Sequence, residues 1–224
     1  MSGSHSTRFP NSVRLLAAVW LAVWLPTYWY TWGVVNFLHF CDISVILTSA
    51  GFLFGSDLLI SSQAVASLLV DAVWTVDVAD KLLFHRAFLG GTEYMFDGHV
   101  ALWIRLLSLF HVVMPPVYLW AIRRNGYDGR GFPLQCAIAF VAFIASRCTN
   151  PALNLNYVFA DPFLHRQFGP ATVHILVAEA FMVIVIYLPT HMALTGFARL
   201  SRNRAGGECG KSYINGTAAF PGAD

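Results

Sequence analysis

The sequence predicts an all-α, polytopic membrane protein: a bundle of six transmembrane helices with both termini in the cytoplasm. Three observations lead to this prediction. The 224 residues are 57% hydrophobic and only 12% charged, which is about half the charged fraction of a soluble domain. The apolar residues form long runs that a bilayer would solvate better than water. The lysines and arginines gather in the connections on one side of the predicted bundle.

The apolar runs mostly have the length of about 17–25 residues that crosses the hydrocarbon core of a bilayer. The fifth run is the shortest and would have to stand upright in the membrane or thin it. The predicted spans are residues 13–32, 34–54, 58–80, 100–122, 133–148 and 171–195. They form one transmembrane domain, 13–195, between a short segment, 1–12, and a basic tail, 196–224, which we expect to be disordered.

Local signals support each boundary in turn. The first run follows a basic start like that of a signal peptide, but it ends in TYWYTW without a small-residue cleavage site, so we expect it to be retained. Pro26 should kink it. Ser56 or Asp57 is placed to cap the third helix. Pro115 and Pro116 should bend the fourth span.

The positions of lysine and arginine set the orientation, because short cytoplasmic loops carry an excess of both. With the N-terminus inside, nine basic residues are cytoplasmic and three are external. A count of five or seven spans would place the two basic ends on opposite sides of the membrane. The cytoplasmic set is Arg8, Arg14, Arg123, Arg124, Arg130, Arg199, Arg202, Arg204 and Lys211, and the external set is Lys81, Arg86 and Arg166.

Polar side chains interrupt these spans mainly in the outer half of the predicted bundle. On a continuous second helix, Asn36, His39 and Asp42 would share one broad face. The third span carries a polar stripe that must face protein or water rather than lipid. Its members are Gln63, Ser67, Asp71, Trp74, Asp77 and Lys81.

The charges in this outer half do not balance. A charged side chain near the bilayer centre costs about 2.5–3.5 kcal/mol, so each must be paired, hydrated or neutralised. We expect Asp71 to pair with Arg105, and Glu179 to pair with Arg105 or Arg147. The remaining acids, beside His39 and His174, indicate a site for a proton, a cation or a metal. The acids are Asp42, Asp71, Asp77 and Glu179, and the arginines are Arg105 and Arg147.

Two function classes follow from this cluster, and a third is structural. The first is a membrane-embedded enzyme acting at the outer leaflet on a lipid or other apolar substrate, with catalytic residues His39, Asp42, Asp71 and Glu179. Its substrate-binding residues would be Asn36, Arg105, Arg147, Glu93 and Tyr157. The second is a transporter or channel subunit for protons, a cation or a small solute. The third is an assembly factor whose polar groups only hold helices together.

The depth of the polar groups favours the enzyme, since a translocation path should reach both leaflets and the inner half offers few polar residues. No cofactor follows from the sequence; a divalent metal, if bound, would use His39 and Asp42. The expected partners are the lipid bilayer and a second copy or another membrane protein, with no nucleic acid.

Short motifs also carry a family resemblance. They are Trp32-Gly33, Asn36-Phe37-Leu38-x-Phe40-Cys41-Asp42, Tyr94-Met95-Phe96-Asp97, Asn156-Tyr157-Val158 and Tyr187-Leu188-Pro189-Thr190-His191. Across about residues 30 to 195 the chain resembles a family of small bacterial multi-span integral membrane proteins of unassigned function. The resemblance implies a bacterial cytoplasmic-membrane location and assigns no role to any residue.

Overall fold

The computed structural model describes residues 9–86 and 91–216, with side chains as far as residue 203. This described part is helical, without strands. The predictions for residues 1–8, 87–90 and 217–224, which include Arg8 and the end of the basic tail, lie outside the described part. The long helices are α1 (Asn11–Trp32), α2 (Phe40–Phe54), α3 (Asp57–Phe84), α5 (Phe110–Asn125), α6 (Gly131–Arg147) and α8 (Leu188–Gly216).

Shorter elements join them. α4 (Leu102–Leu107) precedes α5, and α7 (Ala171–Phe181) continues through the π-helical turn η5 (Met182–Tyr187) into α8. Short 3₁₀ turns occupy the connections at one end of the bundle: η1 (Val34–Leu38), η2 (Glu93–Phe96), η3 (Pro151–Leu153) and η4 (Leu155–Tyr157).

Four helical stretches are long and apolar enough to cross a membrane. They are Asn11–Trp32, Asp57–Phe84, Leu102–Asn125 and Ala171–Asn203, and two shorter apolar helices, Phe40–Phe54 and Gly131–Arg147, lie among them. The prediction of an all-helical protein with several apolar helices of membrane length is therefore confirmed.

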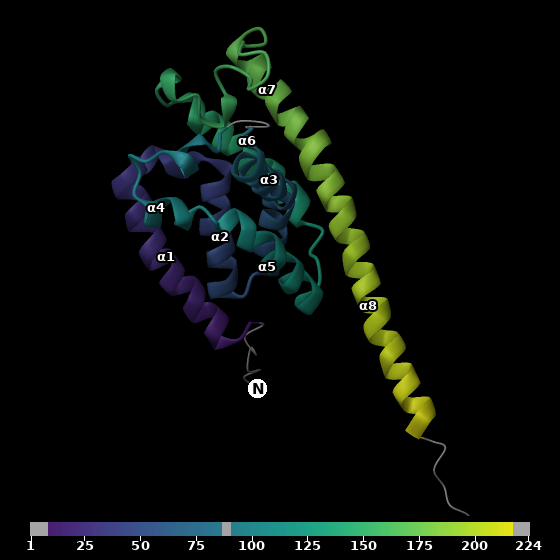
Figure 1. Cartoon of the computed structure of the whole chain (residues 1–224). Helices are drawn as coiled ribbons and strands as arrows, with labels where there is room; N and C mark the ends of the chain where they lie inside the picture. Colours follow the sequence, from purple (N-terminus) through teal and green to yellow (C-terminus); the bar gives the residue numbers. More distant parts are fainter. Residues whose placement is uncertain (1–8, 87–90, 217–224) are drawn as a thin grey trace, which may run out of the picture.

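α3 is the central helix of the bundle. It packs against α2, α5, α6 and the η5–α8 segment, and half of its most apolar stretch is buried, against 17% for α1 and 11% for Ala171–Asn203. α1 and the α7–α8 helix flank the bundle on opposite sides, and the start of α1 lies at the same end as the tail of α8 (Figure 1). The flanking helices thus leave their apolar faces outward, as lipid contact requires.

The second predicted span is not one continuous helix. The chain turns through η1, becomes extended at His39 (φ −60°, ψ 138°), and enters α2 only at Phe40. The expectation that Asn36, His39 and Asp42 share one helix face is therefore wrong. Gly33, with φ of 80°, ends α1 and begins this turn, a conformation that glycine adopts without strain.

The fourth predicted span is also divided, between α4 and α5. Around Ser108 and Leu109 the backbone forms tight bonds three residues apart, such as Leu109 N–H to Leu106 C=O at 3.1 Å. Pro115 and Pro116 remain inside α5. The tight turn lies upstream of both prolines, before α5 begins.

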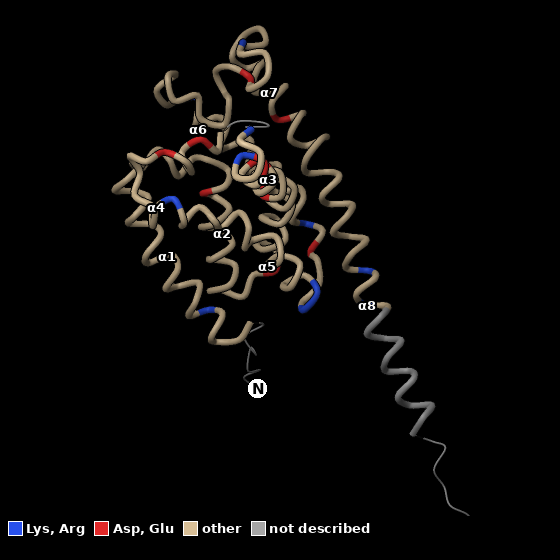
Figure 2. Tube along the Cα trace, in the orientation of Figure 1, with Lys and Arg blue, Asp and Glu red and all other residues tan. Residues whose placement is uncertain are grey.

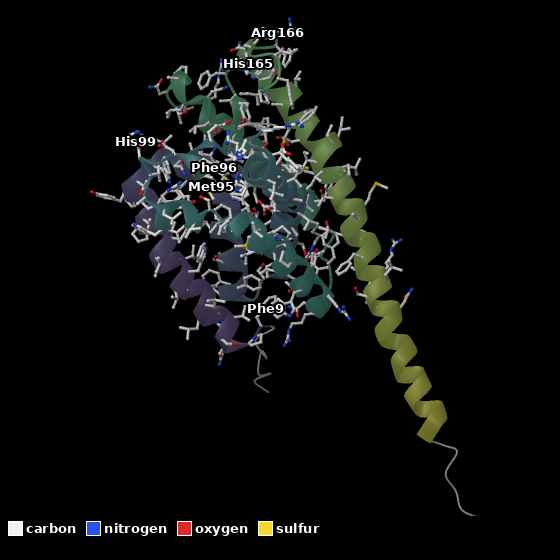
Figure 3. The ribbon with its side chains drawn as sticks, in the orientation of Figure 1. Phe9, Met95, Phe96, His99, His165 and Arg166 are labelled. Carbon is white, nitrogen blue, oxygen red and sulfur yellow. The ribbon has the colours of Figure 1, made fainter. Side chains whose placement is uncertain are left out.

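Phe9 packs at one end of the bundle, where α2 ends and α3 begins. Phe9, which is 1% exposed, packs edge-on against Phe52 with ring centroids 5.0 Å apart, and Figure 3 shows it at the end opposite Met95 and His165. Ser56 caps α3 by accepting a bond from the Leu59 amide, as the sequence suggested. α8 continues to Gly216, beyond the boundary placed at residue 196.

Candidate functional site

The break between η1 and α2 is stabilised by a side chain from far along the chain. The Asn156 amide donates to the Leu38 carbonyl at 2.7 Å and to the Ser146 hydroxyl at 2.9 Å. Its oxygen accepts from the Phe40 amide at 3.3 Å. Asn156 thus replaces the backbone partners that a continuous helix would supply at the break.

Asp42 lies in the first turn of α2 with 2% of its surface exposed. Its carboxyl group accepts a 2.5 Å bond from the Asn36 amide, and the Cys41 thiol lies 3.8 Å from its other oxygen. The structure therefore brings Asn36 and Asp42 together, although by a turn rather than a shared helix face. No hydrogen bond among the described residues joins His39, which is half-buried, to Asp42.

Asp71, on α3, is also 2% exposed. Cys41 lies within electrostatic range of both carboxyl groups. Within the described part of the chain, no hydrogen bond or ion pair reaches the Asp71 carboxyl group, and the expected pair with Arg105 does not form. Two carboxyl groups therefore occupy the core without a basic partner among the described residues.

A hydroxyl network extends inward from this carboxyl pair. Tyr118 of α5, fully buried, bonds the Ser44 hydroxyl at 2.8 Å and the Thr48 hydroxyl at 2.9 Å. Ser67 of α3 donates to Ser44 at 2.6 Å, and Asp71 lies within electrostatic range of Tyr118. Our sequence interpretation missed Tyr118, Ser44 and Thr48, because an apolar span with scattered hydroxyls gives no indication of which ones meet.

A second set of contacts is centred on Ser108. Tyr28 bonds the Ser108 hydroxyl at 2.7 Å, and His111 contacts the Ser108 carbonyl at 2.8 Å while its ring stacks on Trp74 at 4.3 Å. Tyr94, in η2, lies in the same group, and burial raises the pKa of its phenol to about 12. Tyr28 and Tyr94 both lie within electrostatic range of Asp42.

A third polar cluster lies between α3, α6 and η5. The Gln63 side-chain Nε2 donates to the Gln135 side-chain Oε1 at 3.3 Å, and the Gln135 Nε2 donates to the Tyr187 hydroxyl at 3.3 Å. The Gln63 side-chain oxygen is buried without a partner. Glu179, with one buried carboxyl oxygen that also lacks a partner, has its electrostatic neighbours here, Cys136 and Tyr187, rather than Asp42 and Asp71.

The predicted substrate-binding residues of the outer loops lie near one another but apart from the carboxyl pair. Glu93 accepts the Gly91 amide at 2.7 Å, and the Tyr157 hydroxyl lies beside Gly91. Burial, with Glu93 as the second cause, raises the pKa of the Tyr157 phenol. Asn154, Asn156 and Tyr157 all have positive φ, so this connection is held in a conformation that non-glycine residues rarely adopt.

His174 of α7 holds the outer connection in place. Its Nδ1 accepts the Phe168 amide at 3.1 Å, and its Nε2 contacts the Tyr157 carbonyl at 2.9 Å. Both ring nitrogens are used by backbone groups, so this histidine positions the loop. Among the residues that the structure describes, no group of three or more His, Cys, Asp or Glu side chains is arranged to hold a metal ion.

Comparison with known proteins adds nothing to this geometry. No protein-family model matches the chain, and neither the curated proteins nor the solved structures contain a significant match.

Proposed function

We propose that this chain is a six-span protein of a bacterial cytoplasmic membrane with both termini in the cytoplasm. The four long apolar stretches would cross with the shorter helices α2 and α6 between them. Figure 1 supports this topology, because the start of α1 and the tail of α8 lie at one end of the bundle. The middle of α1 carries no charged position (Figure 2), as a lipid-facing helix requires.

Within this framework, Asp42 and Asp71 would form a proton-binding site that serves proton or cation movement across the membrane. The observation that carries the proposal is their burial without a basic partner in the described structure. An isolated carboxylate in such surroundings is costly, and the usual outcome is that the group takes up a proton. A buried acid that must exchange its proton to become charged is the element that proton relays use.

The inner half of the bundle supports transport over an outer-leaflet enzyme. From Asp71 the polar groups continue along α3 through Ser67 to Gln63, a distance of about 12 Å at 1.5 Å per residue. Tyr118 lies beside this path, and Tyr187 reaches its inner end through Gln135. The sequence by itself offered few polar residues here, whereas the packing adds Tyr118, Gln135 and Tyr187, which bond in two separate clusters.

Reconstitution in liposomes tests the proposal. A pH-sensitive dye inside the vesicles would report proton entry under a potassium diffusion potential, with empty vesicles as the baseline. Wild-type protein should carry protons, and Asp71→Asn and Asp42→Asn should abolish or strongly reduce the flux. Asp80→Asn is the matched control, because Asp80 lies near the outer end of the same helix and is partly exposed.

Infrared spectroscopy gives a second readout that does not depend on transport. The carbonyl stretch of a protonated carboxylic acid should be present in wild-type protein and reduced in Asp42→Asn and Asp71→Asn. Flux equal to that of empty vesicles, together with no protonated-acid band, would overturn the proton site.

The lipid-modifying enzyme remains as a second candidate because of one surface feature. An apolar groove of about 350 Å³ opens between α6 and the segment from Leu38 to Ile43, which includes His39 in the chain. Its lining is Leu38, Ile43, Ala137, Ile138, Val141, Ala142 and Ala145. A lipid chain could lie there with its head toward His39. Elemental analysis of purified wild type, His39→Ala and Asp42→Ala tests the metal-dependent version: metal present only in the wild type supports it, and none in any sample rejects it.

A further inference from the structure

Two arginines lie in the outer part of the bundle, and the protein satisfies them to different degrees. Arg147, at the end of α6, donates to the Val158 carbonyl at 2.7 Å and to the Gln167 side chain at 2.9 Å. Its guanidinium also stacks over the Phe159 ring at 4.2 Å. Arg147 therefore fastens the outer connection to α6 and has little capacity left for a ligand.

Arg105, on α4, is far less satisfied. One terminal nitrogen donates to the Met95 carbonyl at 2.9 Å, while its Nε is buried and has no hydrogen-bond partner. No carboxylate in the described part of the chain lies within ion-pair distance of this guanidinium. Neither Asp71 nor Glu179, the two partners that the sequence suggested, reaches it.

A guanidinium keeps its charge in any protein environment, because it cannot release its proton at accessible pH. A buried carboxyl group can be neutralised, but Arg105 can be satisfied only by an acceptor or an anion. Its five N–H groups form a planar fork that matches a phosphate or carboxylate with two parallel bonds. The orphaned Nε belongs to one edge of that fork.

The surroundings of Arg105 indicate where the anion comes from. Its neighbours on α4 are large apolar side chains that point outward: Leu102 is 61% exposed, Trp103 57% and Leu106 49%. An exposed tryptophan beside an arginine at the end of a membrane-length stretch is typical of the headgroup level of a bilayer. Figure 3 shows Met95, the residue that anchors the guanidinium, at the loop end of the bundle.

We propose that Arg105 binds the phosphate group of an anionic phospholipid in the leaflet at the α4 end of the bundle. Met95 holds one terminal nitrogen of the guanidinium in place, and the phosphate oxygens bind the other terminal nitrogen, on the same edge as Nε. Leu102, Trp103 and Leu106 contact the acyl region of the same lipid. This inference depends only on membrane insertion and is independent of the proton site at Asp42 and Asp71.

The test uses the full chain purified in zwitterionic detergent and titrated with phosphatidylglycerol, phosphatidylcholine or inorganic phosphate. Thermal unfolding and native mass spectrometry would report stabilisation and retained lipid. Phosphatidylglycerol should bind the wild-type protein, and Arg105→Gln should weaken that binding roughly tenfold, the equivalent of one lost charge-assisted contact. Arg166→Gln, which removes an exposed arginine of the outer connection, is the control and should bind like the wild type.

Each remaining outcome decides a part of the proposal. Binding of inorganic phosphate as tight as that of phosphatidylglycerol would keep the anion site but reject a lipid as its occupant. Equal binding of phosphatidylcholine, or unchanged phosphatidylglycerol binding in Arg105→Gln, would overturn the site. If Arg105→Gln does not fold, Arg105→Lys answers the question, because it keeps the charge but loses the planar fork and should bind severalfold more weakly than the wild type.

Discussion

The hydroxyl of Tyr118 is the best point at which to test whether the buried polar network holds the bundle together. It bonds both Ser44 and Thr48 in a fully buried position, so Tyr118→Phe removes two hydrogen bonds and leaves the ring in place. Hydrogen bonds between membrane helices contribute about 0.6 kcal/mol on average. The Thr48 hydroxyl can turn back to a carbonyl of its own helix, which limits the loss.

We therefore expect Tyr118→Phe to lower the free energy of unfolding by roughly 1–2 kcal/mol. Unfolding in mixed micelles with increasing denaturing detergent, followed by far-ultraviolet circular dichroism, would measure it. Tyr30→Phe is the control, because Tyr30 is 93% exposed and the change should leave stability unaltered.

A double-mutant cycle of Tyr118→Phe with Ser44→Ala separates the pair from general packing effects. A coupling energy of about 0.5–1 kcal/mol is expected for a direct contact. Purely additive effects, or a Tyr118→Phe variant as stable as Tyr30→Phe, would refute the view that this network contributes to the fold.

Three further predictions concern the backbone and the outer connection. A side chain at Gly131 would meet the Ser62 amide nitrogen at 2.7 Å, whereas one at Gly129 would meet nothing; Gly131→Ala should cost roughly 1–3 kcal/mol in unfolding free energy and Gly129→Ala should not. Asn156→Ala removes the side-chain partner of the Leu38 carbonyl and the Phe40 amide, and should lower the free energy of unfolding by roughly 1–3 kcal/mol. The backbone amides of residues 38–40 should then exchange faster with solvent. Exchange as slow as in the wild type would contradict the assigned role. Desolvation would raise the pKa of the Asp161 carboxyl, but backbone amides that donate to it outweigh this effect and lower it. The stabilisation that Asp161 gives its loop should be complete above about pH 4, the ordinary pKa of an aspartate carboxyl. It should fade as pH falls through the lowered pKa of the folded state, and an NMR titration of the carboxyl carbon would measure that pKa.

Several local features follow from the sequence because their causes are local. Long apolar runs specify helices of membrane length, since the backbone must satisfy its own hydrogen bonds in hydrocarbon. Ser56 caps α3 because its hydroxyl reaches an amide three residues ahead. The sequence also identified Asn36, Asp42 and Asp71 as members of the polar cluster, because polar and charged residues stand out in apolar runs.

The tertiary structure alone decided how those groups are used. The helix break at His39 depends on Asn156, a residue more than a hundred positions away that supplies the missing backbone partners. Among the residues that the structure describes, neither Arg105 nor Arg147 pairs with a carboxylate, because both donate to backbone carbonyl groups of the connections between helices. Charge counting predicts that buried charges must be satisfied. It cannot say by which group, because the choice depends on distances between helices that no local pattern encodes.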